Sequence, residues 1–251
     1  MKTIIAAGGM LLALAGAGVG TARAGDIIGG SSLLDDSRHA QLERWLGQGE
    51  FNLNNVYTLR PGDTSVNFHN AADGKGATFT LIDVTNTAGQ SFLVGGYNPQ
   101  SWSSTDGWHE TERDWQRTAF LFNFDTPAVY RQVSSSFELP SQGQRQTFND
   151  ILFGPVFGSG PDLFVNDDLT RALSWQLSYG NPDNEGVSII DGSLRGQTVS
   201  VNAMEVFAIA PVPEPASGAM LLAGLGVVGG MLRWRQHRRN KPCNARPISV
   251  S

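Results

Sequence analysis

Two uncharged apolar segments, one near each end of the chain, limit where a folded domain can form. The first runs from Ile4 to about Gly20 and follows the basic residue Lys2. The second runs from Ala216 to Leu232, and its 17 residues are at the short end of what spans a bilayer core as a helix. The residues between them, 25–211, suffice for one domain with its own hydrophobic core.

The N-terminal segment has the organisation of a secretory signal. A basic start and an apolar run lead to Ala22-Arg23-Ala24, a small-x-small cleavage site directly before Gly25. We expect residues 1–24 to be a signal peptide, cleaved between Ala24 and Gly25 after export through the Sec translocon. A permanent N-terminal membrane helix is the alternative, and the Ala-x-Ala step favours cleavage.

The C-terminal region has three parts in a fixed order. Pro213, Glu214 and Pro215 precede the apolar segment, which predicts a transmembrane helix. Basic residues that keep the far end in the cytoplasm follow at once: Arg233, Arg235, Arg238, Arg239 and Lys241. This order resembles the PEP-CTERM sorting signal, here residues 211–241, with 242–251 as a cytoplasmic tail. The resemblance implies recognition and cleavage by an exosortase-type enzyme. A plain membrane anchor is the alternative.

Both ends predict the same topology. We expect an exported protein whose precursor is anchored in the inner membrane. The mature domain is then periplasmic, on the cell surface or extracellular. The resemblance to the PEP-CTERM signal implies envelope components or exopolysaccharide as its partners.

The charge and cysteine content of residues 25–211 exclude several function classes. This segment holds 22 acidic and 10 basic residues, a net charge of −12, which makes it a poor partner for nucleic acid. The only cysteine, Cys243, lies beyond the apolar segment. The domain therefore has no disulfide and no thiol chemistry, and a metal there would need oxygen or histidine ligands. We expect no cofactor.

Local patterns predict a mainly β (α+β) domain. Asp35 or Asp36 caps a helix through Leu46 with Gly47 as its stop, and a second short helix covers 65–72. Residues 25–44 form a helical lead-in to the domain proper, 45–210. The β-rich segments are 77–84, 91–97, 119–124, 128–133, 163–165, 174–179, 187–190 and 203–209. We expect a two-sheet antiparallel β-sandwich with a few flanking short helices, followed by the C-terminal transmembrane helix.

Five segments, in order, resemble the signature segments of the TLDc domain. They contain His69, Asp73 and Gly76; Gly95, Gly96, Tyr97, Ser101 and Trp102; Phe120 to Phe122; Gly154, Pro155, Phe157, Gly158, Asp162 and Leu163; and Glu205, Val206 and Phe207. The resemblance implies two antiparallel sheets with flanking helices. Ala72 stands where many relatives carry cysteine. The Gly95-Gly96 pair predicts a bulge or a close approach of backbone.

Few residues suggest chemistry. His69 with Asp73 is more consistent with a buried or capping histidine than with a catalytic or metal-binding one. Acidic residues that invite a calcium interpretation are Asp162, Asp167 and Asp168, without EF-hand spacing. The loop from Trp102 to Trp115, with Trp108, His109 and Glu112, suggests a sugar-stacking platform if the rings are exposed. Core or loop packing is the more common role of such rings.

We therefore expect a non-enzymatic, exported TLDc-like protein for surface or matrix interactions. The alternative is an envelope glycan-binding or glycan-modifying protein that uses the Trp102–Trp115 loop. Eukaryotic TLDc proteins are associated with oxidation resistance and with a cytosolic proton-pump surface. An exported domain without a thiol is not expected to share either role.

Overall fold

The computed structural model describes residues 25–134 and 141–212. The described residues form the domain, whose compact unit ends at Ile209, within the last described strand. Its helices are α1 (Asp36–Leu46), α2 (Ser65–Ala72) and α3 (Ser141–Gln144), with 3-10 turns at Asp114–Gln116 and Pro182–Asn184. Its strands are β1 (Ile27–Ile28), β2 (Phe51–Thr58), β3 (Thr78–Thr85), β4 (Ser91–Asn98), β5 (Gly107–Glu110), β6 (Phe120–Asn123), β7 (Ala128–Arg131), β8 (Arg145–Asn149), β9 (Val156–Phe157), β10 (Leu163–Val165), β11 (Arg171–Leu173) and β12 (Val199–Pro211).

The two helices predicted from the sequence, one ending at Leu46 and one covering 65–72, are confirmed. Asp35 accepts a hydrogen bond from the backbone of Arg38, and Gly47 ends α1 in the left-handed conformation, with φ of 71°. At the start of α2, the side chain of Asn67 accepts from the backbone N–H of Thr64 at 3.0 Å. These contacts are local in sequence, so the sequence pattern alone is sufficient to place them.

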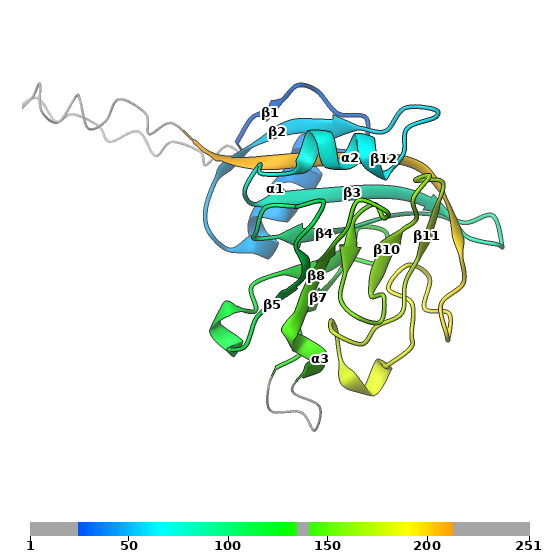
Figure 1. Cartoon of the computed structure of the whole chain (residues 1–251). Helices are drawn as coiled ribbons and strands as arrows, with labels where there is room; N and C mark the ends of the chain where they lie inside the picture. The colour runs from blue at the N-terminus through cyan, green and yellow to red at the C-terminus, as the bar shows by residue number, and fades with distance from the viewer. Residues whose placement is uncertain (1–24, 135–140, 213–251) are drawn as a thin grey trace, which may run out of the picture. The chain divides into compact units, whose positions relative to one another are not determined.

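The strands form one hydrogen-bonded sheet rather than the two separate sheets that the sequence predicted. The strand order is β5-β8-β9-β10-β11-β12-β3-β4-β6-β7, and β2 pairs with β12 and with β1. Figure 1 shows β3 and β12 as long strands across the domain, with β10 and β11 running at a steep angle to β3. Because β11 pairs with β12, the half that contains β9 to β11 stays joined to the central strands while it covers them.

Both faces of the central strands are buried. Because side chains alternate along a strand, each strand contributes to two hydrophobic clusters. One cluster lies under α1 and β2 and includes Leu42, Phe51, Phe79, Tyr97, Phe120 and Phe122. The other lies under α2 and β9 to β11 and includes Phe68, Ile82, Val94, Trp102, Leu121 and Phe157. The predicted lead-in therefore contributes core residues, since Leu42 of α1 is fully buried.

Two of the predicted strands do not form. Residues 174–179 and 187–190 form no regular strand and make only the isolated bridges Gln132↔Tyr179 and Val187↔Leu194. Several of their backbone N–H groups bond to side chains instead, and others bond to backbone carbonyls in turns. Ser174 Oγ accepts from the N–H of Ile189 at 2.9 Å, and Ser188 Oγ accepts from the N–H of Ile190 at 3.1 Å. Backbone groups engaged by side chains are not available to a sheet ladder.

Gly95 and Gly96 make a close approach and no bulge. The register between β3 and β4 runs without a shift from Thr78↔Asn98 to Thr85↔Ser91. A β-carbon on Gly95 would lie 2.6 Å from the ring of Phe122, and one on Gly96 would lie 2.6 Å from the ring of Phe157. The pair thus leaves room for one aromatic ring on each face of β4.

Candidate functional site

His69 lies buried on α2 with both ring nitrogens engaged. Its Nδ1 is 2.7 Å from a carboxylate oxygen of Asp73. Its Nε2 is 3.0 and 3.1 Å from the carbonyl oxygens of Asp150 and Phe153. Carbonyl oxygens only accept, so Nε2 carries a proton and donates. The ring therefore joins α2 to the 150–153 loop and offers neither nitrogen to a metal or a substrate.

The turn after α2 is tied to the end of β4. The backbone N–H of Gly74 donates to the carbonyl of Trp102 at 3.1 Å, and Gly76 donates to Ser101 Oγ at 2.9 Å. Gly76 has a φ of 77°, which favours glycine. These contacts join the turn after α2 to the loop after β4.

Trp102 belongs to the core, so the prediction that it forms part of a sugar-stacking platform is wrong. The side chain is 1 % exposed and packs edge-on against Phe68 and Phe157. Its Nε1 donates to Thr78 Oγ1 at 3.0 Å. A ring enclosed in this way presents no face to a sugar.

The rest of the predicted platform is partly accessible. Trp115 is 72 % exposed. Trp108 is half-buried against Phe148, with ring centres 4.8 Å apart, and the guanidinium carbon of Arg145 lies 4.9 Å from its ring centre. Burial lowers the pKa of the neighbouring His109. Of the three tryptophans in the predicted platform, Trp115 is exposed, whereas the Trp108 ring already contacts Phe148 and Arg145.

Asp162 is fully buried and organises the loop before Gly180. Its Oδ1 accepts from the backbone N–H groups of Leu177, Ser178 and Tyr179, at 2.6, 2.8 and 2.8 Å. Burial raises the pKa of this carboxyl to about 7, although the N–H donors act in the opposite direction. A β-carbon on Gly158 would lie 2.0 Å from the Asp162 carboxylate, which explains a glycine there.

This placement corrects the calcium interpretation. Asp162 faces the interior, whereas Asp167 and Asp168 are exposed. Asp168 instead accepts from the backbone N–H of Thr170 at 2.9 Å. Across residues 25–134 and 141–212, no three His, Cys, Asp or Glu side chains are grouped to hold a metal ion.

Glu205 of β12 binds the N-terminal lead-in. The side chain is 2 % exposed. Its Oε1 accepts from the backbone N–H and the hydroxyl of Ser32, both at 2.9 Å, and its Oε2 accepts from the hydroxyl of Ser31. The Ser31 hydroxyl accepts in turn from the N–H of Leu34 at 2.7 Å. Sequence patterns do not reveal this role, because the partners are more than 170 residues apart.

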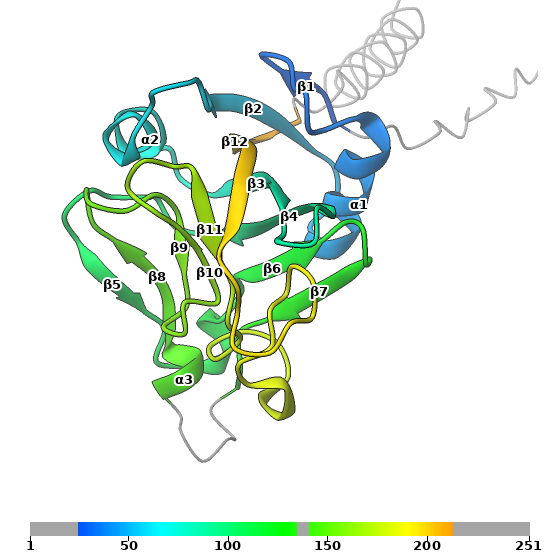
Figure 2. The ribbon, with the colours of Figure 1, turned by 90° about the vertical axis from the view of Figure 1, so that its right-hand side faces the viewer.

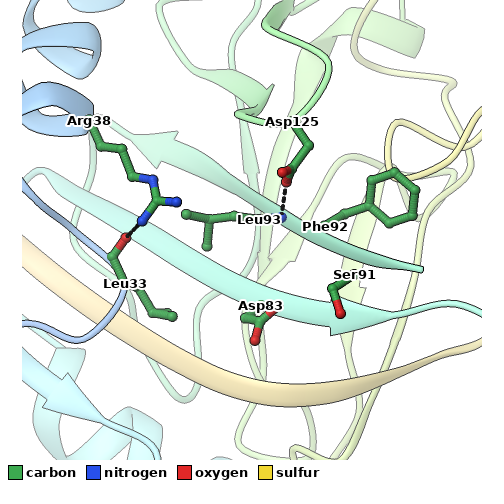
Figure 3. Close-up of a pocket in the computed structure, with 7 residues that line it drawn as sticks. All are labelled: Leu33, Arg38, Asp83, Ser91, Phe92, Leu93 and Asp125. Atoms are coloured by element: carbon green, nitrogen blue, oxygen red, sulfur yellow. Dashed lines mark hydrogen bonds between the residues drawn. The ribbon is translucent and has the colours of Figure 1, made fainter. Parts of the chain in front are cut away.

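Two adjacent hollows lie along α1 and were missed by the sequence reasoning. The first has a volume of about 230 Å³ (Figure 3) and the second about 220 Å³, and Arg38 and Asp125 line both. A guanidinium N–H of Arg38 donates to the carbonyl of Leu33 at 2.9 Å, and Asp125 accepts from the N–H of Leu93 at 2.6 Å. Ligand pockets usually measure about 300–1,000 Å³. Each hollow is smaller, so neither identifies a ligand.

The comparison with protein families concerns the segment that follows the domain. Residues 211–239 match the family model described as the PEP-CTERM protein-sorting motif. The chain carries a PEP-CTERM sorting motif. The match includes the Pro213–Pro215 triplet and the four arginines from Arg233 to Arg239. The motif implies an exported protein that is made as a membrane-anchored precursor and processed by an exosortase-type enzyme.

The PEP-CTERM motif begins where β12 ends, at Pro211. The predicted signal peptide, the triplet, the span 216–232 and the basic cluster lie outside the described residues. Within the described part of the chain, no helix is long and apolar enough to cross a membrane. The family comparison gives no evidence for a TLDc domain. No curated protein matches this chain.

Proposed function

We propose that this chain is a precursor matured at both ends, whose domain acts as a non-catalytic interaction module at the cell surface or in the extracellular matrix. The observation that carries the proposal is the PEP-CTERM motif at residues 211–239, directly after the last strand. Removal of everything beyond about Pro213 leaves every strand of the domain in the mature protein. Sorting and folding thus use separate parts of the chain.

A non-catalytic role is supported by what the most reactive side chains do. His69, Asp162 and Glu205 are all at most 2 % exposed, and each binds backbone or side-chain groups of the domain itself. Catalytic groups need access to a substrate. These three side chains hold loops in place instead.

We further propose that the exported domain is TLDc-like. This proposal is supported by the five sequence segments in their order and by contacts among them. Asp73 forms a bridge with Trp102, and Trp102 packs against Phe157, so three of the segments meet in the core.

The test follows the mass of the mature protein in its host. The full chain is expressed, the cells are fractionated, and the intact mass is measured. We expect loss of residues 1–24 and of everything after about Pro213. Replacing Pro213, Glu214 and Pro215 together by Ala should block the C-terminal cut, whereas Pro247→Ala, beyond the motif, should not. A wild-type protein that keeps Cys243 and stays in the inner membrane would refute processing.

Glycan binding is the second candidate, favoured by the exposure of Trp115. Affinity electrophoresis in gels that contain host exopolysaccharide tests it. Retardation that is lost in Trp115→Ala but kept in Trp175→Ala, a second exposed tryptophan, would support this function. Equal mobility with and without the polysaccharide would exclude it.

A further inference from the structure

Gly25, the first residue after the predicted cleavage site, lies in a slot that admits no side chain. A β-carbon on Gly25 would lie 1.9 Å from the carbonyl oxygen of Phe51 and 3.0 Å from the backbone nitrogen of Asn52. The small-x-small signal for cleavage consists of Ala22 and Ala24, which stand before the cut. The requirement for glycine at this position therefore comes from the folded domain.

A carboxylate faces the backbone nitrogen of Gly25. Glu43 Oε1, on α1, accepts from this nitrogen at 3.1 Å and from the N–H of Phe51 at 3.1 Å. The Glu43 side chain is only 12 % exposed. The Glu43 carboxylate is therefore largely enclosed. One of its two hydrogen-bond donors is Gly25, the first residue of the predicted mature chain.

A buried histidine completes this cluster. His39 is fully buried, and its Nε2 lies 3.6 Å from Glu43 Oε1. Neither of its ring nitrogens has a hydrogen-bond partner. The nearest charged group to Nε2 is the Glu43 carboxylate, so His39 and Glu43 form one buried polar pair beside the start of the predicted mature chain.

The residues that follow Gly25 are fixed to β2. The N–H of Asp26 donates to the side chain of Asn52 at 2.8 Å, and the carbonyl of Asp26 accepts from the N–H of Leu53 at 2.9 Å. Ile27 and Ile28 then pair with β2 in parallel. Figure 2 shows β1, β2 and α1 together at one side of the domain. The hydrogen bonds of Asp26 to β2 therefore keep the neighbouring Gly25 nitrogen within hydrogen-bonding distance of Glu43.

We propose that removal of the signal peptide creates a binding partner for Glu43: the α-ammonium group of Gly25 docks on the Glu43 carboxylate and fixes β1 against α1. Hydrolysis of the Ala24–Gly25 bond consumes one water, leaves a carboxylate on Ala24 and gives Gly25 an amine that takes up a proton. Before cleavage the Gly25 nitrogen donates to Glu43 as a neutral amide N–H. After cleavage the same nitrogen donates to Glu43 as a charged ammonium group. Charge-assisted hydrogen bonds are shorter and stronger than neutral ones. Cleavage thereby stabilises the exported domain.

The experiment compares two N-termini on the same chain. Residues 25–251 are released in detergent from a cleavable fusion that leaves Gly25 first, and a second preparation keeps Ala24 ahead of it. The extra residue moves the ammonium by about 3.8 Å. We expect the chain that starts at Gly25 to have a Tm higher by at least about 3 °C. Glu43→Gln should abolish the difference, and Glu50→Gln, an exposed glutamate nearby, should preserve it.

Amine labelling gives a second measurement that does not depend on a folded Glu43→Gln variant. The Gly25 amine of the native chain should react with an amine-selective reagent about tenfold more slowly than in urea, because a docked ammonium releases its proton less readily. Equal Tm values for the two termini together with equal labelling rates would overturn the proposal. Because the fusion creates the terminus in vitro, this result is separate from any failure of sorting or of the proposed function in the host.

Discussion

The aromatic ring of Phe157 lies directly against the backbone of Gly96, with its Cζ atom 2.6 Å from where a β-carbon would stand. This contact joins β9 to the central strand β4, although the two residues are 61 positions apart. Gly96 is therefore a packing residue, since its φ lies outside the range that requires glycine.

Gly96→Ala should destabilise the domain by about 1–3 kcal/mol, because the new methyl group must displace Phe157 and Leu121. Phe157→Leu removes the ring atoms that would collide. The double variant should therefore lose less stability than the sum of the two single changes. Urea unfolding measures all three. Strict additivity would contradict the contact.

Asp162→Asn should change how stability depends on pH. Burial raises the pKa of Asp162 to about 7 from an ordinary 3.8, so between these values the folded form binds a proton that the unfolded chain lacks. Stability from this group is fully present below about pH 4 and is lost as pH rises to 7, by a few kcal/mol at about 1.4 kcal/mol per pKa unit. The difference between the wild type and the variant, from urea unfolding at several pH values, should follow this course. A constant difference would refute it.

His69→Leu should cost about 2–4 kcal/mol, because it leaves the Asp73 carboxylate and two carbonyl groups without their buried donor. Asn70→Ala, an exposed change on the same helix, is the matched control and should have little effect. Both are compared by thermal unfolding. Near-equal stability would mean that His69 does not hold the 150–153 loop.

Glu205→Ala should loosen the N-terminal lead-in while β12 stays in the sheet. Without the carboxylate, Ser31 and Ser32 lose the acceptors that fix the chain before α1. Hydrogen exchange should accelerate at Leu33 and Leu34, and Asn202→Ala, an exposed change on β12, should leave it unaltered. If hydrogen exchange at Leu33 and Leu34 is unchanged in both variants, Glu205 does not hold the N-terminal lead-in.

The mature domain should not consume peroxide, because its residues include no cysteine thiol. The purified wild-type chain and Cys243→Ser should give the same background rate in a peroxide-loss assay. Catalytic loss of peroxide that is sensitive to His69→Ala would contradict a non-enzymatic role.

Local signals predicted several elements closely. The capping residues Asp35 and Gly47 place α1, and β10 has the predicted bounds, 163–165. In contrast, β2 is not among the predicted strands, and it contains Asn52, Asn54 and Asn55, residues that are more typical of turns. Phe51 and Leu53 nevertheless alternate toward the core, and pairing with β12 decides the conformation.

The false strand at 174–179 has a physical explanation as well. Its apolar residues alternate, yet the N–H groups of Leu177, Ser178 and Tyr179 all donate to Asp162. A carboxylate 15 to 17 residues away thus converts a strand-like pattern into a bound loop. Sequence pattern does not reveal that competition, since the acceptor arrives only when the chain has folded.

The sequence by itself determined the C-terminal sorting motif, because a triplet, an apolar segment and a basic cluster are recognised from linear order, length and charge. Only the tertiary structure decided what His69, Trp102, Asp162 and Glu205 do. Their partners lie up to 174 residues away, and burial, which separates an accessible side chain from a structural one, is a property of the packed domain. The slot around Gly25 belongs to the same class, since Glu43 and Phe51 form it only after α1 and β2 have come together.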